Sequence, residues 1–217
     1  GTVLLGRQTD FADTISAYTA VNDFGGWVSN SGSGLDRLQG TRTNNSISYT
    51  TANLNGFTGN LIYGFGETAG KTSAGQSFGL GAKYDNGPLG LGAAYYQSKQ
   101  GTTPSDTSLI QGVAPSASAS ASTLATYNAT TAANAANAGS TALKSLNVVA
   151  SYQFGPARVY ANYSRVKQDL KGTPTVATAT LANAQKVDTY EIGTAYSLSP
   201  SLKLLAAVDH TRANFDG

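Results

Sequence analysis

The 217-residue chain has no cysteine, no methionine, one tryptophan and one histidine, and charged residues make up only 12% of it. The absence of cysteine excludes disulfides and thiolate metal sites. The charged fraction is about half of the ~25% that is usual in soluble domains. Hydrophobic residues are not enriched to compensate, at 40%, and small polar residues fill the difference. A net charge of +2, with no two Lys or Arg residues adjacent, indicates no nucleic-acid partner.

No apolar run approaches the ~18–20 residues that a membrane-spanning helix requires, which excludes a helical membrane protein. The dominant pattern is instead hydrophobic alternation with a period of two. Leu146, Val148, Ala150, Tyr152 and Phe154, for example, share one face of their segment. Alternation over eight or more residues is typical of half-buried strands. The pattern predicts nine strands, at 2–7, 45–52, 57–66, 77–86, 89–99, 143–154, 157–168, 186–198 and 202–213.

The expected connections between these strands fall into two kinds. Short turns contain Asn-Gly, Gly-Pro or Ser-Pro, at 55–57, 84–89, 152–157 and 196–201, and such pairs favour hairpin loops of two to four residues. The intervening connections are mostly long, and the one spanning 100–142 is of low complexity and rich in Ala, Ser, Thr and Asn. Short turns on one rim and long loops on the other are expected of a transmembrane β-barrel.

Aromatic residues bracket the short turns, where a soluble protein would expose polar side chains. In a membrane barrel Tyr and Phe form girdles at the two interfaces with water. One girdle is predicted at Tyr84, Tyr152, Phe154 and Tyr196, and the other at Tyr63, Phe65, Tyr95 and Tyr163. The opposite faces of the strands are too small and polar to pack a dry core, so they are expected to line water. The predicted pore-lining residues are Ser46, Ser48, Lys83, Asp85, Arg158, Glu191 and Lys203.

The N-terminal stretch "GTVLLGRQTDFADTI" and the later "NDFGGWVSN" and "TRTNNSISY" resemble the general porins of Gram-negative outer membranes, most closely the trimeric β-proteobacterial type. The resemblance implies a homotrimer and passive diffusion of small hydrophilic solutes and ions, without a cofactor or metal. It also implies that the loop at 8–42 folds back into the barrel and constricts the pore. Charged residues implied at the constriction are Arg7, Arg42, Asp23, Arg37, Asp13 and Asp36.

Opposed charges across a constriction would orient solutes and select ions, with a mild preference for anions. Because side chains alternate between the two faces of a strand, Arg42 is expected on the inward face with Asn44, Ser46 and Ser48. Parity does not place Arg7 there, so Arg7 is expected beyond the regular end of its strand. In the proteins that this one resembles, the position of Ser48 is often occupied by a basic residue. We therefore expect the preference of this protein for anions to be weak.

The resemblance also indicates how much of a whole barrel this chain would form. Single-chain bacterial barrels have an even number of strands, and the family has sixteen, whereas about nine are predicted here. We therefore expect this chain to be the middle portion of a longer porin. The Gly79-x-Gly81 and Gly90-x-Gly92 pairs are expected to face the lumen or a neighbouring barrel, and not to bind phosphate, because no helix follows them.

Three alternatives remain at this stage. The barrel could act as an adhesin or surface antigen through the 100–142 loop. It could be an outer-membrane enzyme using Asp209 and His210, although no nucleophile is placed beside them. Lastly, the strands could form a soluble β-sandwich with an aromatic core. The polar second face of the strands argues against the sandwich.

Overall fold

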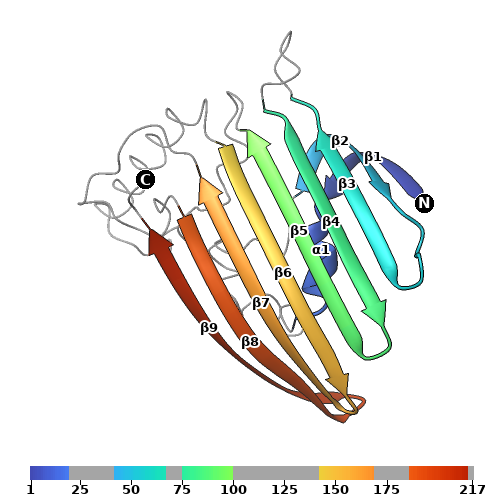
Figure 1. Ribbon diagram of the computed structural model, residues 1–217, viewed down its shortest axis with the longest axis vertical. Helices are drawn as coiled ribbons and strands as arrows, with labels where there is room; N and C mark the ends of the chain where they lie inside the picture. The colour runs from blue at the N-terminus through green and yellow to red at the C-terminus, as the bar shows by residue number, and fades with distance from the viewer. Residues whose placement is uncertain (20–41, 67–74, 100–141, 169–185, 215–217) are drawn as a thin grey trace.

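The structure is a computed structural model that describes residues 1–19, 42–66, 75–99, 142–168 and 186–214. It consists of nine β-strands and one short α-helix, arranged as Figure 1 shows. The elements are β1 (Thr2–Thr9), α1 (Phe11–Ser16), β2 (Arg42–Thr50), β3 (Phe57–Gly64), β4 (Ser77–Asn86), β5 (Leu89–Lys99), β6 (Ala142–Phe154), β7 (Ala157–Gln168), β8 (Lys186–Ser199) and β9 (Leu202–Asn214).

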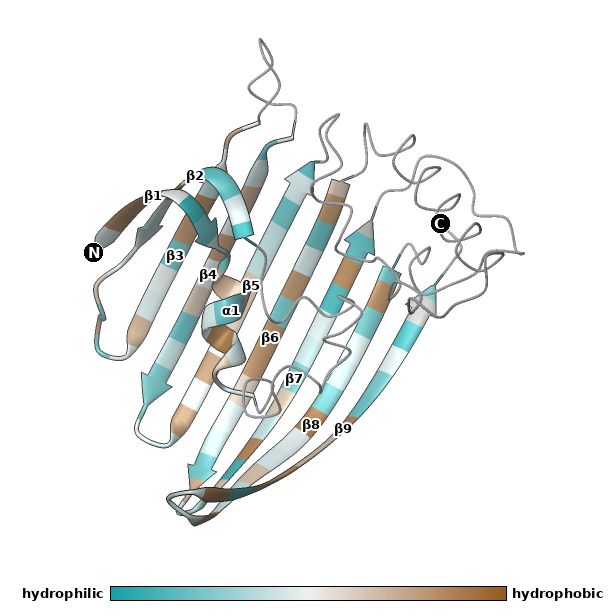
Figure 2. Ribbon diagram, turned by 180° about the vertical axis from the view of Figure 1, so that it is seen from behind, coloured by the Kyte–Doolittle hydropathy of each residue, from teal (hydrophilic) through white to brown (hydrophobic). Residues whose placement is uncertain are grey.

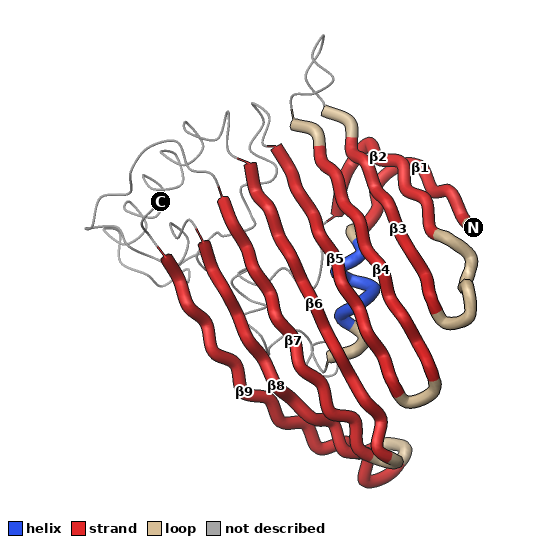
Figure 3. Tube along the Cα trace, in the orientation of Figure 1, coloured by secondary structure: helices blue, strands red, loops and turns tan. Residues whose placement is uncertain are grey.

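The strands form one antiparallel sheet in which each strand pairs with its neighbours in sequence, in the order β1 to β9. The prediction of nine strands is confirmed, and no boundary moves by more than three residues. β1 and β9 are the two edges of this sheet and do not pair with each other. Figure 3 shows the sheet as a curved wall with α1 as the one helix among the described residues. The fold is therefore all-β, and the described part is an arc of a barrel.

The predicted sorting of the connections is also confirmed. The β2–β3, β4–β5, β6–β7 and β8–β9 turns lie at one end of the sheet, and β3, β5 and β7 end at the other (Figure 1). The β2–β3 turn has positive φ at both central residues, 53° at Asn55 and 95° at Gly56. Positive φ at two consecutive residues matches the right-handed twist of a hairpin, and Asn-Gly is the pair that adopts it most readily.

The two faces of the sheet differ in chemistry, as the alternating hydropathy along each strand in Figure 2 indicates. Large apolar side chains are exposed on the face away from α1, which we call the outer face; examples are Leu80 at 45%, Ile192 at 66% and Val208 at 77%. The face that α1 covers, the inner face, carries mainly Gly, Ser, Asn and charged residues. An exposed apolar outer face is what a barrel presents to lipid. Among the described residues, no helix is long and apolar enough to cross a membrane.

The sheet curls toward α1 at its N-terminal end, where β1 and β2 turn over onto the helix side (Figure 2). The hydroxyls of Thr43 on β2 and Tyr96 on β5 lie 2.9 Å apart, although β3 and β4 separate those strands. Glycines in the two intervening strands make this approach possible. A Cβ on Gly64 would lie 2.5 Å from Thr43 Cγ2, and one on Gly79 would lie 3.2 Å from the Tyr96 ring.

Two turn glycines allow a matched test of the hairpins. A Cβ on Gly56 would meet the backbone oxygen of Asp85 at 2.1 Å, whereas Gly87, at φ 57°, has no atom within 4 Å of such a Cβ. We expect Gly87→Ala to lower the free energy of unfolding by about 1 kcal/mol, the cost of left-handed backbone for alanine. Gly56→Ala should cost clearly more, because it adds a clash with backbone. Denaturant titration of the full-length protein in lipid vesicles measures both, and equal losses would contradict this account.

Candidate functional site

The segment that follows β1 forms a short helix, which sequence analysis did not predict. Asp10 is its N-cap, and its carboxylate accepts a hydrogen bond from Ala12 N at 2.9 Å. Asp13 adds negative charge to the first turn, which favours a helix N-terminus. Phe11 and Ile15 are four residues apart and lie on one buried face. The signal was present in the sequence as an Asp cap before an apolar pair with helical spacing.

Three glycines of β4 and β5 leave the space in which this segment lies, and we call them the glycine seat. A Cβ on Gly81 would lie 2.2 Å from the Phe11 ring, one on Gly92 would lie 2.6 Å from Ile15 Cγ2, and one on Gly90 would lie 2.6 Å from the Tyr18 ring. The glycines therefore face inward, as expected, but α1 and Tyr18 cover them. Contact with a neighbouring barrel is not their role on this face.

Apolar packing holds α1 on the seat. Phe11, Ala12 and Ile15 form a buried cluster with Ala94 of β5 and Val149 of β6, and Tyr18 packs against it. Full burial of a Phe or Ile side chain contributes roughly 1.5–3 kcal/mol. The expectation that the inner face cannot pack an apolar core is thus wrong at this location. The glycines of the seat have no side chains, and the apolar side chains of the helix fill the space above them.

Polar contacts fix the end of the segment beyond α1. The Tyr18 hydroxyl donates a hydrogen bond to Asp85 Oδ1, and Lys83 Nζ lies 2.9 Å from Asp85 Oδ2. Burial, followed by the hydrogen bond to Asp85, raises the pKa of Tyr18 above its usual range. Tyr18 therefore stays protonated, and remains a donor to Asp85, at neutral pH. Lys83 and Asp85, both predicted to line the pore, lie on the inner face and form an ion pair.

Arg158 of β7 binds the same segment from the other side. Its guanidinium donates hydrogen bonds to the carbonyl oxygens of Ala17 at 3.1 Å and Thr19 at 3.0 Å. Carbonyl groups at a helix C-terminus lack intrahelical partners and carry partial negative charge, so a cation there is stabilising. Arg158 is on the inner face, as predicted, and it also holds the loop in place, a role that sequence reasoning did not find.

Arg7 and Arg42 lie where β1 and β2 are irregular. Gly6 pairs with Ser46 and Gln8 pairs with Thr43, so Asn44 and Asn45 together oppose Arg7 in a β-bulge. The bulge, at which Asn45 has a φ of 46°, shifts the alternation of β2 by one residue. Thr43, buried and bonded to Tyr96, takes the inner face.

The parity argument for Arg42 is therefore wrong, since Arg42 is adjacent to Thr43 and exposed. The expected position of Arg7 beyond its strand is also wrong, because Arg7 lies within β1 and is exposed. A place for either residue at a pore constriction stays a prediction.

The remaining predicted pore-lining residues are all on the inner face by register. Ser46 and Ser48 are buried beside Gln8, to which Ser48 donates a hydrogen bond, so the expectation that these two serines line water is wrong. Lys203 is exposed. Glu191 is only 1% exposed and accepts a hydrogen bond from the Tyr160 hydroxyl at 2.6 Å, so the expectation that it lines water is wrong. Within the described part of the chain, no group of His, Cys, Asp and Glu residues could hold a metal ion.

A family model described as "Gram-negative porin" matches residues 1–216. The chain belongs to the Gram-negative porin family. Its place is accordingly the outer membrane. No curated protein matches the sequence of this porin significantly.

Two solved structures are similar to it in fold. An anion-selective porin from Comamonas acidovorans aligns with 97% of this chain and 53% of its own length, at 18% identity and a TM-score of 0.60. OmpF from Salmonella typhi, in a complex with daunomycin, aligns with 97% of this chain and 55% of its own length, at 16% identity and a TM-score of 0.62. The chain thus spans about half the length of these porins.

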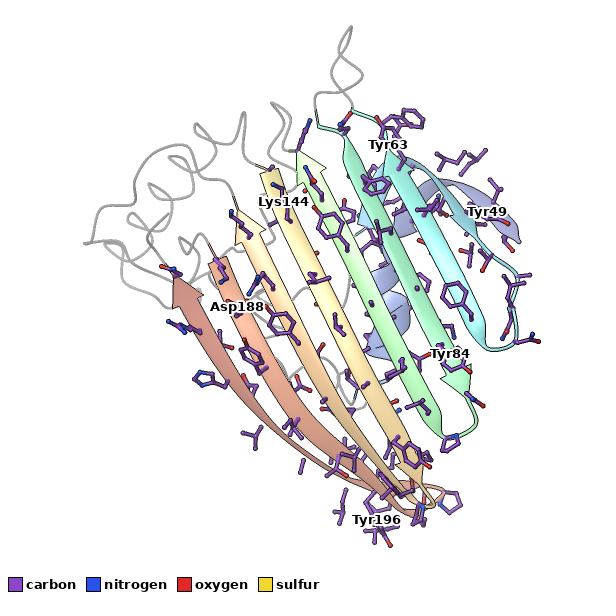
Figure 4. All side chains as sticks on the ribbon, in the orientation of Figure 1. Tyr49, Tyr63, Tyr84, Lys144, Asp188 and Tyr196 are labelled. Carbon is purple, nitrogen blue, oxygen red and sulfur yellow. The ribbon has the colours of Figure 1, made fainter. Side chains whose placement is uncertain are left out.

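The predicted girdle residues of this porin occupy suitable positions. Seven lie in strands with the register of the outer face, and Phe65 directly follows β3, with its ring 5.0 Å from that of Tyr63. Tyr84 and Tyr196 are near the short turns, and Tyr63 is near the opposite end (Figure 4). Asp23, Asp36 and Arg37 lie outside the described residues, as does the 100–142 loop apart from Ala142 in β6, so their predicted roles remain predictions. Asp13 is described, as an exposed residue of α1.

Arg158→Gln tests whether Arg158 holds the loop. The amides of Tyr18 and Thr19 bond to the carbonyls of Ile15 and Ser16, each at 3.0 Å, so their hydrogen exchange reports on this end of the segment. Loss of two charge-assisted hydrogen bonds should accelerate their exchange about tenfold or more. Arg165→Gln, on the outer face of the same strand, is the matched control and should leave these amides unchanged. Equal exchange rates in both variants would contradict the assignment.

Proposed function

We propose that the complete protein forms a water-filled channel for passive diffusion of small hydrophilic solutes and ions across the outer membrane. The observation that carries this proposal is the docking of residues 10–19 on the inner face, because a loop placed inside a barrel wall narrows its lumen. The apolar outer face supports the lipid bilayer as the surrounding phase. Membership of the porin family supports a homotrimer, which we propose as the assembly.

The narrowing segment would act as a fixed part of the pore wall. Its apolar side chains are buried against the seat, and its polar groups are bound by Asp85 and Arg158. A segment held at both its apolar face and its end cannot swing freely with each passing solute. We infer that size filtering occurs between α1 and the opposite wall, with Asp13, which is exposed on α1, in contact with the pore water.

Selectivity would depend on the charges around this narrowing. We propose that Arg7 and Arg42, near the start and end of the loop, favour anions mildly, with Asp23, Asp36, Arg37 and Asp13 contributing from the loop. Opposed charges across a narrow water-filled passage create a transverse field. Lys83 contributes little net attraction to anions in this proposal, since it is paired with Asp85.

Unseating α1 should widen the channel. Gly92→Val places a branched side chain where Ile15 Cγ2 would lie 2.6 Å from the new Cβ. Ala93→Val places the same side chain on the exposed outer face of β5. We expect a larger single-channel conductance in planar bilayers for Gly92→Val and an unchanged one for Ala93→Val. Ile15→Ala, which loosens α1 without inserting bulk into the sheet, should act in the same direction. Unchanged conductance in both α1-loosening variants would disprove the constriction, and a wild-type protein without conductance would favour the adhesin alternative.

The arginines are tested by the reversal potential of the full-length protein in a salt gradient. Arg42→Gln and Arg7→Gln should each shift it toward cations, because each removes a positive charge near the proposed narrowing. Arg212→Gln removes the same charge from β9, at the opposite edge of the sheet from β1 and β2, and should have no effect. If the protein conducts ions but none of these substitutions alters its selectivity, the result would support the channel. It would contradict the placement of both arginines at the constriction.

A further inference from the structure

Two of the short turns contain an Asn-Gly pair, which is a chemically reactive sequence. Asn55-Gly56 lies in the β2–β3 turn, and Asn86-Gly87 lies in the β4–β5 turn. In such a pair the backbone nitrogen of the glycine can attack the side-chain amide of the asparagine, and glycine hinders this attack least because it has no Cβ. Both asparagines are exposed, and both turns lie at the same end of the sheet (Figure 1). The two pairs therefore differ mainly in how the fold holds the glycine.

The structure holds Gly56 on both sides. Its backbone nitrogen donates a hydrogen bond to Asn53 Oδ1 at 2.7 Å, and its carbonyl oxygen accepts one from Asp85 N at 2.9 Å. A Cβ at this position would lie 2.1 Å from the backbone oxygen of Asp85, so the adjacent strand leaves little room for the turn to rearrange. The proton that Gly56 N must lose before it can attack Asn55 is thus held in a hydrogen bond.

Gly87 has none of these restraints in the part of the chain that the structure describes. No hydrogen bond to Gly87 N is present there, and a Cβ built on Gly87 would have no atom within 4 Å. The turn is anchored instead through Pro88, whose carbonyl oxygen accepts a hydrogen bond from Gln153 N at 2.9 Å. Asn86, Gly87 and Pro88 are all exposed. Gly87 N is therefore available to the side chain of Asn86.

The side chain of Asn86 is accessible as well. Its Nδ2 donates a hydrogen bond to the Tyr84 hydroxyl at 3.1 Å, and Figure 4 shows Tyr84 close to this turn. Hydrogen bonds between groups in contact with water are readily exchanged for bonds to water, so their net contribution is small. The bond engages the amide nitrogen of Asn86 and leaves its carbonyl carbon, Cγ, open to attack.

We propose that Asn86 is a site of spontaneous deamidation, and that the side chain of Asn53 protects Asn55 from the same reaction. Hydroxide removes the proton of Gly87 N, and this nitrogen attacks Asn86 Cγ. The new N–Cγ bond forms as the Cγ–Nδ2 bond breaks, and Nδ2 leaves as ammonia after it takes a proton from water. Water then opens the resulting succinimide ring. Cleavage at Cγ gives aspartate, whereas cleavage at the main-chain carbonyl carbon gives isoaspartate.

The products alter the hairpin that carries the glycine seat. Isoaspartate routes the main chain through Cβ and so adds one carbon atom to it just before the turn. Asn86 pairs in register with Leu89, and the length of a hairpin connection fixes such a register. The additional atom is incompatible with this pairing, so isoaspartate destabilises the β4–β5 hairpin. The reaction does not depend on conduction, so this inference can fail while the channel stands.

The two rates are measured with the full-length protein in neutral detergent. The protein is incubated in mildly alkaline buffer and digested at intervals for mass spectrometry, with electron-transfer fragmentation to identify isoaspartate. We expect Asn86 to react at least about fivefold faster than Asn55, the factor that one typical hydrogen bond contributes. The same protein unfolded in guanidinium chloride is the control, and there the two pairs should react at similar rates. Equal rates in the folded protein, or a ratio that persists after unfolding, would overturn the proposal.

The protective role of Asn53 is tested by substitution. Asn53→Ala removes the acceptor of the Gly56 N–H and should accelerate deamidation of Asn55 about fivefold. The matched control is Asn60→Ala on β3, which removes a side chain that bonds to Thr50 instead and should leave the rate at Asn55 unchanged. An unchanged rate in Asn53→Ala would disprove the protection.

Asn86→Gln tests the reactive site and its effect on the hairpin. Glutamine keeps the amide but extends the side chain by one carbon atom, so the five-membered ring cannot form and the mass change at this turn should disappear. The melting temperature should fall during incubation of the wild type and stay constant in Asn86→Gln. A mass change that persists in this variant would overturn the site, and an equal fall in melting temperature would contradict the effect on the hairpin.

Discussion

A barrel wall can accept a helix closely on its inner side where the side chains of the wall are missing or small, and the seat formed by Gly81, Gly90 and Gly92 meets that condition. Phe11, Ile15 and Tyr18 occupy the space that these glycines leave. The remaining contacts of the loop follow from this docking, because it brings Tyr18 to Asp85 and the end of α1 to Arg158. The proposed pore geometry depends on the same contact.

The two faces of the sheet are adapted to two different solvents. The outer face exposes large apolar side chains in its middle, as lipid requires, and the inner face carries small and polar residues. The rims are not equivalent, however. Aromatic residues without charge mark the short turns, whereas cations on β6 to β9 accompany tyrosines at the other end.

Predictions from the alternation along the strands were wrong where a bulge interrupted the alternation. They were also wrong where residues distant in the sequence buried a side chain. Alternation counted back along β2 assigned Arg42 to the inner face, but the bulge at Asn44 and Asn45 shifted the register and gave that face to Thr43. Glu191 was correctly assigned to the inner face, yet it is buried against Tyr160 and does not line water. A six-residue helix was missed because its one strong signal, an Asp cap before an apolar pair, lies within a segment otherwise read as loop.

The sequence by itself determined the nine strands, their order and the sorting of their connections, because alternation with a period of two and the Asn-Gly and Gly-Pro turns depend on neighbouring residues. It also determined which face of most strands is apolar. Only the tertiary structure decided where the loop lies and which polar side chains hold it. Arg158 and Thr19 are 139 residues apart in the chain, and they meet because the curvature of the sheet brings β7 to the end of α1, a relation that no local pattern encodes.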